Sequence, residues 1–184
     1  MMCVCRCRWV NLKNPVYIAY HDGEWGNTSL SEQALYELFI LETFQAGLSW
    51  ECVLNKREAF REAYEGFLPE RVAQFDEGKI NDLLNNPAII RNRLKILSSV
   101  KNTHIYLNIV SEFASFRNYI LSFLPESQII EPYTARTTSP ISDAISLDLK
   151  KRGMKFCGST IIYSYLQAAG FISAHGPECD LYKG

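Results

Sequence analysis

The stretch DLKKRGMKFCGST, residues 148–160, places a short turn between two segments with helical patterns. Gly153 and Gly158 bound this turn, and apolar residues lie between them. Two helices joined by a short glycine-bounded turn are typical of a helix-hairpin-helix. The pattern therefore predicts such a motif over about residues 140–170.

A hairpin of this kind suits a phosphate group. Its glycines let the backbone approach a ligand closely, and the N–H groups that open the second helix, near Ser159 and Thr160, favour an anion through the helix dipole. Further phosphate contacts are expected from three basic side chains, Lys150, Lys151 and Lys155. A solvated helix face is the other interpretation of these lysines, and any pair of helices can be joined by glycine.

Helical patterns also dominate the rest of the chain, without any internal repeat. The predicted helices span residues 32–46, 50–64, 69–72, 79–84, 88–113, 116–123, 142–152 and 160–170. Residues 29–32 have the spacing of a capping box. Within 88–113, a helical period relates Ile90, Leu94, Leu97 and Lys101. Residues 128–140 are polar and β-branched, which indicates an extended surface loop. The predicted fold class is all-α.

Length and composition set the broad class of the protein. The 184 residues suffice for a single unit, whole or divided into two small lobes. With 47% hydrophobic and 21% charged residues, the composition is that of a soluble globular protein. No segment approaches transmembrane length and the start lacks a signal-peptide pattern, so we expect a cytoplasmic monomer without a membrane partner. The net charge of −1 still allows DNA binding through a local basic patch.

A carboxylate falls on an apolar helix face in the stretch LETFQAGLSW, residues 41–50. Spacing puts Glu42 on the same face as Leu35 and Phe39. Burying an ionised carboxylate without partners costs roughly several kcal/mol. Glu42 therefore requires a salt bridge, for instance to Arg57, a shifted pKa or a function.

A metal site is suggested by histidines and cysteines near the two ends of the chain. One pair has the spacing H-x3-C, which lets both side chains reach one ion, and a second pair lies near the start. The candidate ligands are Cys7, His21, His175 and Cys179. They make a Cys2His2 set, as in a closed structural zinc site. Cys3 and Cys5 are alternatives to Cys7 on this pattern, and chance proximity in sequence is the other interpretation.

Seven blocks of the chain combine uncommon residues in a fixed order. They are RCRWV (6–10), PVYIAYHDGEWG (15–26), LETFQAGLSW (41–50), KREAFREAY (56–64), IIRNRLKI (89–96), DLKKRGMKFCGST (148–160) and AAGFISAH (168–175). Together with Cys179 they closely resemble the 3-methyladenine DNA glycosylase I family, over nearly the whole chain.

The resemblance implies a helix-hairpin-helix glycosylase fold and a repair activity. Such an enzyme flips 3-methyladenine out of alkylated double-stranded DNA and hydrolyses its N-glycosidic bond, leaving an abasic site without cutting the strand. The resemblance also implies a structural zinc that joins the termini, about residues 1–30 with 165–184. Its ligands match Cys7, His21, His175 and Cys179, and not Cys3 or Cys5.

The resemblance further implies functions for single residues in a base pocket. Glu42 and Tyr20 match groups that hydrogen-bond the excised base, and Trp50 matches the aromatic on which it stacks. Other pocket aromatics match Trp9, Tyr17 and Trp25. Because a cationic purine leaves readily, we expect Glu42 to bind the base first and to activate water second.

DNA contacts are implied in the same way. Gly47 and Leu48 match the stretch that enters the duplex, and residues 153–158 match the phosphate clamp. Two positions depart from the family pattern: residues 27–30 lack its usual proline and acidic residue, and Leu147 replaces a commonly basic one.

Two other functions are alternatives to the enzyme. One is a DNA-binding module without catalysis, and the other is a zinc-stabilised helical interaction domain.

Overall fold

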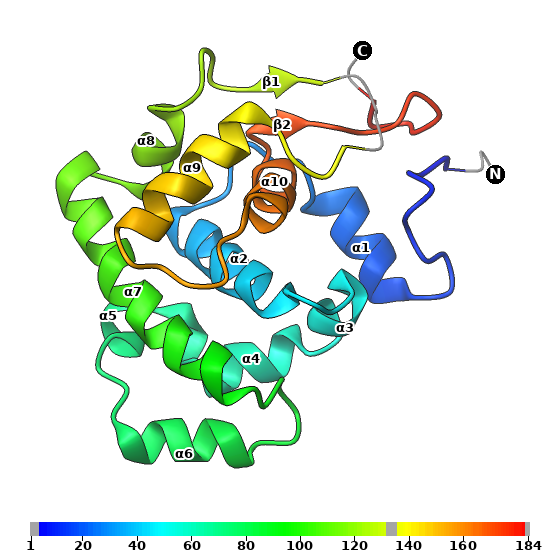
Figure 1. The fold of residues 1–184 in the computed structure, drawn as a ribbon. Coiled ribbons are helices and arrows are strands. Elements are labelled where there is room, and N and C mark those ends of the chain that lie inside the picture. The colour runs from blue at the N-terminus through cyan, green and yellow to red at the C-terminus, as the bar shows by residue number, and fades with distance from the viewer. Residues whose placement is uncertain (1–3, 132–135, 183–184) are drawn as a thin grey trace.

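The computed structural model describes residues 4–131 and 136–182, and its architecture is mainly helical (Figure 1). The elements in chain order are α1 (Pro15–Gly23), α2 (Glu32–Gln45), α3 (Trp50–Leu54), α4 (Arg57–Ala63), the 3-10 helix η1 (Glu65–Phe67), α5 (Pro69–Val72), α6 (Glu77–Asn85), α7 (Arg93–Phe113), α8 (Phe116–Leu121), β1 (Ile129–Ile130), α9 (Pro140–Lys151), α10 (Ser159–Ala168) and β2 (Ile172–Ser173). Among these described residues, no helix is long and apolar enough to cross a bilayer.

One detail of the all-α prediction is wrong, because β1 and β2 form a small parallel pair. Ile129 pairs with Ile172, and Ile130 pairs with Ser173. Residues 128–140 were expected to be an extended loop, and the part that forms β1 is extended. Residues 132–135 lie outside the described part of the chain. Pro140 is already the first residue of α9.

Helix α2 forms the centre of the molecule and packs against α3, α7, α8 and α10 (Figure 1). Its bounds agree with the predicted 32–46, but its cap differs from the expected box over 29–32. Ser31 is the N-cap, and its side chain accepts from the backbone N–H of Ala34. The Glu32 carboxylate instead accepts from the backbone N–H groups of Phe116 and Arg117, which joins α2 to the start of α8.

The predicted helix over 50–64 is wrong, since the chain breaks between α3 and α4. Asn55 and Lys56 lie at the break and have partners elsewhere in the fold. The Asn14 amide donates to the Asn55 side-chain oxygen, and the Lys56 ammonium donates to the carbonyl of Ala88. Tertiary contacts thus override the local helical pattern.

Helix α7 begins at Arg93, later than the expected residue 88, because the Asn92 side chain caps it by accepting from the N–H of Lys95. The leucines of the helical period noted in the sequence are exposed. Leu94 is 68% exposed and Leu97 38% exposed. The buried side of α7 contains apolar residues, such as Ile96 and Ile109, and hydroxyl groups. Ser99 and Thr103 hydrogen-bond the phenols of Tyr64 and Tyr36.

Helices α9 and α10 form the predicted helix-hairpin-helix arrangement and pack against each other. Pro140 stands at the first turn of α9, and Ser139 and Ser142 form a reciprocal capping box. At the end of α10, Gly170 has φ +75°, as expected of a helix-terminating glycine. A Cβ there would lie 2.7 Å from the carbonyl carbon of Asn27, so the loop over residues 27–30 also depends on glycine at this position.

Candidate base-binding site, DNA-contacting surface and metal centre

A cavity of about 300 Å³ opens between α1, α2, α3 and α10. Its lining residues are Trp9, Tyr17, Tyr20, Trp25, Glu42, Gln45, Trp50, Ser164 and Gln167. All six residues expected to bind the base therefore line one cavity. Its size and aromatic walls suit a flat heterocycle, because ligand sites are concave and mostly apolar with a few placed polar groups.

Glu42 lines this cavity and is 3% exposed. Its Oε2 has no hydrogen-bond partner within the described part of the chain. Burial raises the pKa of Glu42 to about 8. The alternative of a salt bridge to Arg57 is wrong, since Arg57 bonds the carboxylates of Glu37 and Glu24.

Two further buried polar atoms without partners lie in the same cavity. Among side-chain atoms of the described residues, four are buried and unpartnered: Glu42 Oε2, Gln45 Oε1, Trp50 Nε1 and Tyr165 Oη. The first three belong to residues that line the cavity. Buried polar groups are nearly always hydrogen-bonded, so this cluster indicates a site that a polar ligand completes.

Sequence reasoning missed three polar residues of the lining. Gln45 follows Glu42 by three positions on α2, and Ser164 and Gln167 have the same spacing on α10. Residues three apart share a helix face. Polar pairs at this spacing on otherwise apolar helices were therefore the signal that could have found them.

The aromatic residues pack on one another around the cavity. The Tyr20 and Trp50 ring centroids are 5.4 Å apart, and Trp9 lies 5.4 Å from Tyr17 and 5.0 Å from Trp25. Burial, together with the charge of Glu42, raises the pKa of Tyr20 well above its ordinary value. Tyr20 is therefore a neutral phenol that can donate a hydrogen bond into the site.

An exposed turn follows directly after α2. Gly47 has φ +78°, which favours glycine, and Leu48 is 42% exposed. The ammonium of Lys95 on α7 donates to the carbonyls of Phe44 and Ala46, at 2.7 and 2.5 Å. This lysine satisfies carbonyls at the helix end and fixes the turn, so Leu48 projects from a rigid support.

Two side chains of α7 contact the α9–α10 hairpin: Glu112 bonds Arg152 at the end of α9, and Asn102 bonds the turn itself. The Asn102 amide donates to the carbonyl of Lys155 and accepts from its N–H, at 2.8 and 2.9 Å. Gly153 has φ +100°, and Gly158 provides no side chain to cap α10. Within the residues described, the N–H groups of Ser159 and Thr160 have no hydrogen-bond acceptor, so they are free for an anion.

The basic run around the hairpin divides into two classes. Lys150, Lys151 and Lys155 are exposed. Arg152 instead bonds Asp148 and Glu112, so it stabilises the fold. The three lysines predicted to contact phosphate are thus the accessible charges of this run.

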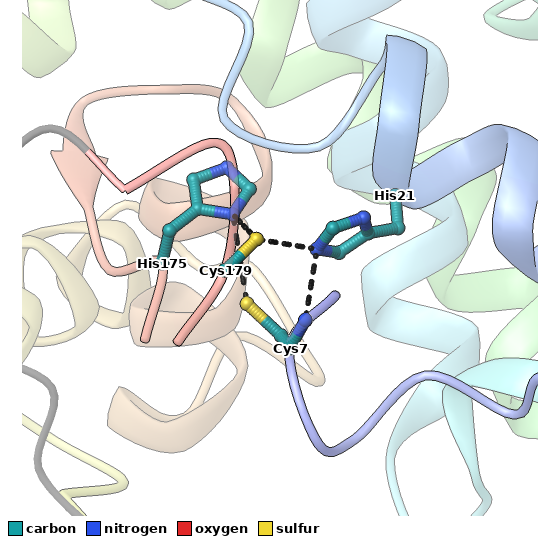
Figure 2. A group of neighbouring side chains, drawn as sticks. All are labelled: Cys7, His21, His175 and Cys179. Carbon is teal, nitrogen blue, oxygen red and sulfur yellow. Dashed lines mark hydrogen bonds between the residues drawn. The ribbon is translucent and has the colours of Figure 1, made fainter. Parts of the chain in front are cut away.

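The four predicted metal ligands come together from the two ends of the chain (Figure 2). Their candidate ligand atoms all lie within 4.8 Å of one another, and all four residues are buried. His175 Nδ1 lies 3.5 Å from the sulfur of Cys7 and 3.5 Å from that of Cys179. His21 Nε2 lies 3.6 Å from the Cys179 sulfur. The geometry confirms the predicted cluster.

The surroundings of the cluster fit a bound cation. His21 turns Nε2 toward the cysteines while Nδ1 contacts the Asp22 carboxylate at 2.8 Å, and Asp22 in turn bonds Arg6. Such a carboxylate behind a histidine orients the ring of a metal ligand. Two sulfur and two nitrogen donors suit a tetrahedral ion. Cys5 is exposed and lies outside the cluster, and Cys3 lies outside the described residues.

The metal cluster and the cavity share two tryptophans. The Trp25 ring packs edge-on against His175 with centroids 4.6 Å apart, and Trp9 packs against His21 at 5.2 Å. Both tryptophans also line the cavity. The position of the cavity wall therefore depends on the cluster.

Comparison with known proteins agrees with this geometry. The family model described as methyladenine glycosylase matches residues 9–183. The chain is 40% identical to DNA-3-methyladenine glycosylase 1 of Escherichia coli (strain K12) over 97% of each chain. It is 38% identical to the DNA-3-methyladenine glycosylase of Haemophilus influenzae, over 95% of this chain and 96% of the relative. A variant 3-methyladenine DNA glycosylase I solved in complex with 3-methyladenine superimposes with a TM-score of 0.91, at 34% identity, covering 97% and 98% of the chains.

Proposed function

The chain belongs to the methyladenine glycosylase family, and from that premise we propose how its residues carry out the reaction. It is a DNA-repair hydrolase that removes 3-methyladenine from alkylated DNA by hydrolysing the N-glycosidic bond, which leaves an abasic site. The observation that supports the residue assignments best is the aromatic cavity lined by Glu42, whose Oε2 has no hydrogen-bond partner in the described residues.

The first step is extrusion of the damaged nucleotide, because a base inside a duplex cannot reach a cavity. Unstacking costs roughly a few kcal/mol. We assign to Leu48 the filling of the vacated space and to Gly47 the backbone conformation that lets it do so. The fixed turn after α2 supports this assignment, because a wedge on a mobile loop would lose conformational entropy on insertion.

The extruded base then enters the cavity and stacks on Trp50, with Trp9, Tyr17 and Trp25 closing the walls. Tyr20 donates a hydrogen bond to it. The aromatic walls exclude water, so electrostatic interactions in the cavity are stronger than at the surface. Aromatic faces also attract a cationic base.

Glu42 is the group that discriminates a cationic base from a neutral one. N3-methylation gives the adenine a positive charge, and an opposite charge nearby favours the ionised carboxylate. The pKa of about 8 in the cavity therefore falls when the base binds, and Glu42 releases its proton to water. An ordinary adenine offers no positive charge, so the cost of ionising a buried carboxylate is not offset.

Bond breaking needs little further help. The methylated purine departs as a neutral base and leaves a cationic sugar, to which water adds. We assign to the Glu42 carboxylate the stabilisation of that cation and the acceptance of a proton from the water. Binding of the base is its first function and activation of water its second.

The hairpin and its lysines hold the DNA backbone. We assign a phosphate to the free N–H groups of Ser159 and Thr160, with Gly153 and Gly158 allowing close approach. Additional phosphate contacts come from Lys150, Lys151 and Lys155. These contacts fix the duplex so that the flipped nucleotide faces the cavity.

We further propose that the cluster of cysteines and histidines binds zinc. Cys7, His21, His175 and Cys179 would hold the ion, and the termini over about residues 1–30 and 165–184 would be joined through it. When bound, the ion supplies a closed structural tie without reactive water, because four protein ligands leave no open position. Trp9 and Trp25 then keep the cavity wall in place.

The oligomeric state, the cellular location and the division into lobes are also proposals. We propose that the enzyme acts as a monomer in the cytoplasm, as one unit of two lobes.

The assay that tests this function measures purine release from methylated duplex DNA, with chromatographic identification of the base. Release of 3-methyladenine is expected. Binding to duplex DNA without release would favour a non-catalytic DNA-binding module. Neither binding nor release would favour an interaction domain for which DNA is irrelevant.

A further inference from the structure

The block IIRNRLKI, residues 89–96, contains two arginines, Arg91 and Arg93, that have no function in the reaction proposed for this chain. Most arginines of the chain have carboxylate partners: ion pairs engage Arg6, Arg8, Arg57, Arg61, Arg71 and Arg152. Arg117 bonds the carbonyl of Leu30. By contrast, Arg91 and Arg93 are exposed, and neither forms an ion pair with any carboxylate in residues 4–131 or 136–182. Arg136 also forms no ion pair with the described carboxylates, but it lies alone, whereas Arg91 and Arg93 are two residues apart on one exposed segment.

The backbone that carries these two arginines is fixed on both sides. Lys56, just after α3, donates to the carbonyl of Ala88 at 3.0 Å. Asn92 caps the first turn of α7 by accepting from the N–H of Lys95. Ile89 is 3% exposed and anchors the segment in the core. A fixed backbone leaves less entropy of segment ordering to be lost when these side chains bind a ligand.

The same segment lies beside the turn that carries Leu48. The Lys95 ammonium reaches the carbonyl of Ala46, two residues before Leu48, at 2.5 Å. Asn102, two turns further along α7, holds the hairpin at Lys155. Helix α7 therefore contacts both the Leu48 turn, through Lys95, and the hairpin, through Asn102, and the arginine pair lies at its start. Helix α10 of the hairpin packs against α2, which the Leu48 turn follows (Figure 1).

We propose that Arg91 and Arg93 form a second phosphate-binding site for the DNA duplex, separate from the hairpin. The partner is the sugar-phosphate backbone, because two guanidinium groups without internal carboxylates match an array of phosphates. Lys95 links the Leu48 turn to the end of α7 that carries this site, so both would contact the same part of the duplex. Phosphate contacts at this site and at the hairpin would hold the duplex while the nucleotide is extruded. The inference rests on the proposed function, since it needs a protein that binds duplex DNA.

Its test measures the salt dependence of binding to a fluorescent duplex that contains a tetrahydrofuran abasic-site analogue. Each phosphate contact contributes about 0.9 to the slope of log K against log salt. Arg91→Gln with Arg93→Gln is expected to flatten that slope by between about 1 and 2. The matched control, Arg71→Gln with Lys79→Gln, removes the same charge from α5 and α6, where Glu65 is the carboxylate partner, and should leave the slope unchanged.

Two further readouts separate this inference from the proposed function. Melting temperature and binding of free 3-methyladenine, followed by tryptophan fluorescence, should match the parent in the Arg91/Arg93 variant. An unchanged slope in that variant, or an equal change in the control, would overturn the second phosphate site. Failure of the parent protein itself to release 3-methyladenine would instead overturn the function.

Discussion

Glu37 and Glu42 lie on the same helix, α2, and both are buried, with exposed fractions of 7% and 3%. Glu37 bonds Arg57 and Arg61. Glu42 has an oxygen without any partner in the described residues and faces the cavity. The two carboxylates therefore have opposite effects on the fold: one stabilises it, and the other destabilises it in favour of ligand binding.

Thermal unfolding of two matched variants tests this difference. The pKa of Glu42 is raised from 4.5 to about 8, so between these values the folded protein keeps a proton that the unfolded chain has released. The free energy of unfolding then falls as pH rises through this window. Glu42→Gln removes that loss, and we expect it to stabilise the protein above pH 8 by about 1 to 4 kcal/mol, with no gain near pH 4.

Glu37→Gln is the control for that measurement. It leaves Arg57 and Arg61 without a buried partner, so we expect a loss of about 2 to 4 kcal/mol at neutral pH. A lower melting temperature for Glu42→Gln at pH 8 would show that Glu42 has a stabilising partner after all.

Leu48→Ala tests the wedge. Because Leu48 is 42% exposed, its truncation should change stability by no more than about 0.5 kcal/mol. Excision from duplex DNA should slow about tenfold, since the vacated stack is no longer filled. Excision from single-stranded methylated DNA should be unaffected. Leu12→Ala, at 65% exposed, is the control, and equal effects of both variants would contradict a specific function of Leu48.

Substitutions of the hairpin lysines should weaken DNA binding without changing stability, and substitution of Arg152 should lower stability without changing DNA binding. Lys150→Gln with Lys151→Gln should flatten the salt dependence of duplex binding by about 1.8 while the melting temperature stays constant. Arg152→Gln should do the reverse, because Arg152 is bonded to Asp148 and Glu112. We expect it to cost about 1 kcal/mol of stability and leave the salt slope intact. If the lysine variant binds duplex DNA with the same salt dependence as the parent, the two lysines belong to a solvated helix face and do not contact phosphate.

Metal analysis of purified protein tests the cluster at the termini. We expect one zinc per chain, lost in Cys179→Ser but not in Cys52→Ser, because Cys52 lies on α3 outside the cluster. Loss of the ion should lower the melting temperature by at least about 5 °C. It should also change tryptophan fluorescence, since Trp25 packs against His175. Equal zinc content in both variants would exclude Cys179 as a ligand.

Much of the site could be predicted because its pattern is local. The spacing of α2 placed Glu42 on a buried face, and the glycines of the hairpin marked the turn between α9 and α10. The ligand cluster involves residues far apart in sequence, so its proximity needed the resemblance and then the structure. Spacing alone left Cys3 and Cys5 as alternatives to Cys7.

The failures arose where tertiary contacts outweigh local pattern. The helical period of Leu94 and Leu97 did not show which side of α7 is buried. The helix buries Ser99 and Thr103 together with apolar residues, and their hydroxyls hydrogen-bond tyrosines in the core. Polar side chains can be buried when they are hydrogen-bonded, and the periodicity of apolar residues does not reveal such a face. The functions of single residues and the division into lobes stay predictions.

The most direct test of the account is single-turnover release of 3-methyladenine from methylated duplex DNA by Glu42→Gln. We expect release to slow by at least about 100-fold, roughly 3 kcal/mol of lost transition-state stabilisation. Duplex affinity should persist, and Glu37→Gln, assayed well below its melting temperature, should excise at close to the parent rate. Release at the parent rate by a folded Glu42→Gln protein would contradict the account.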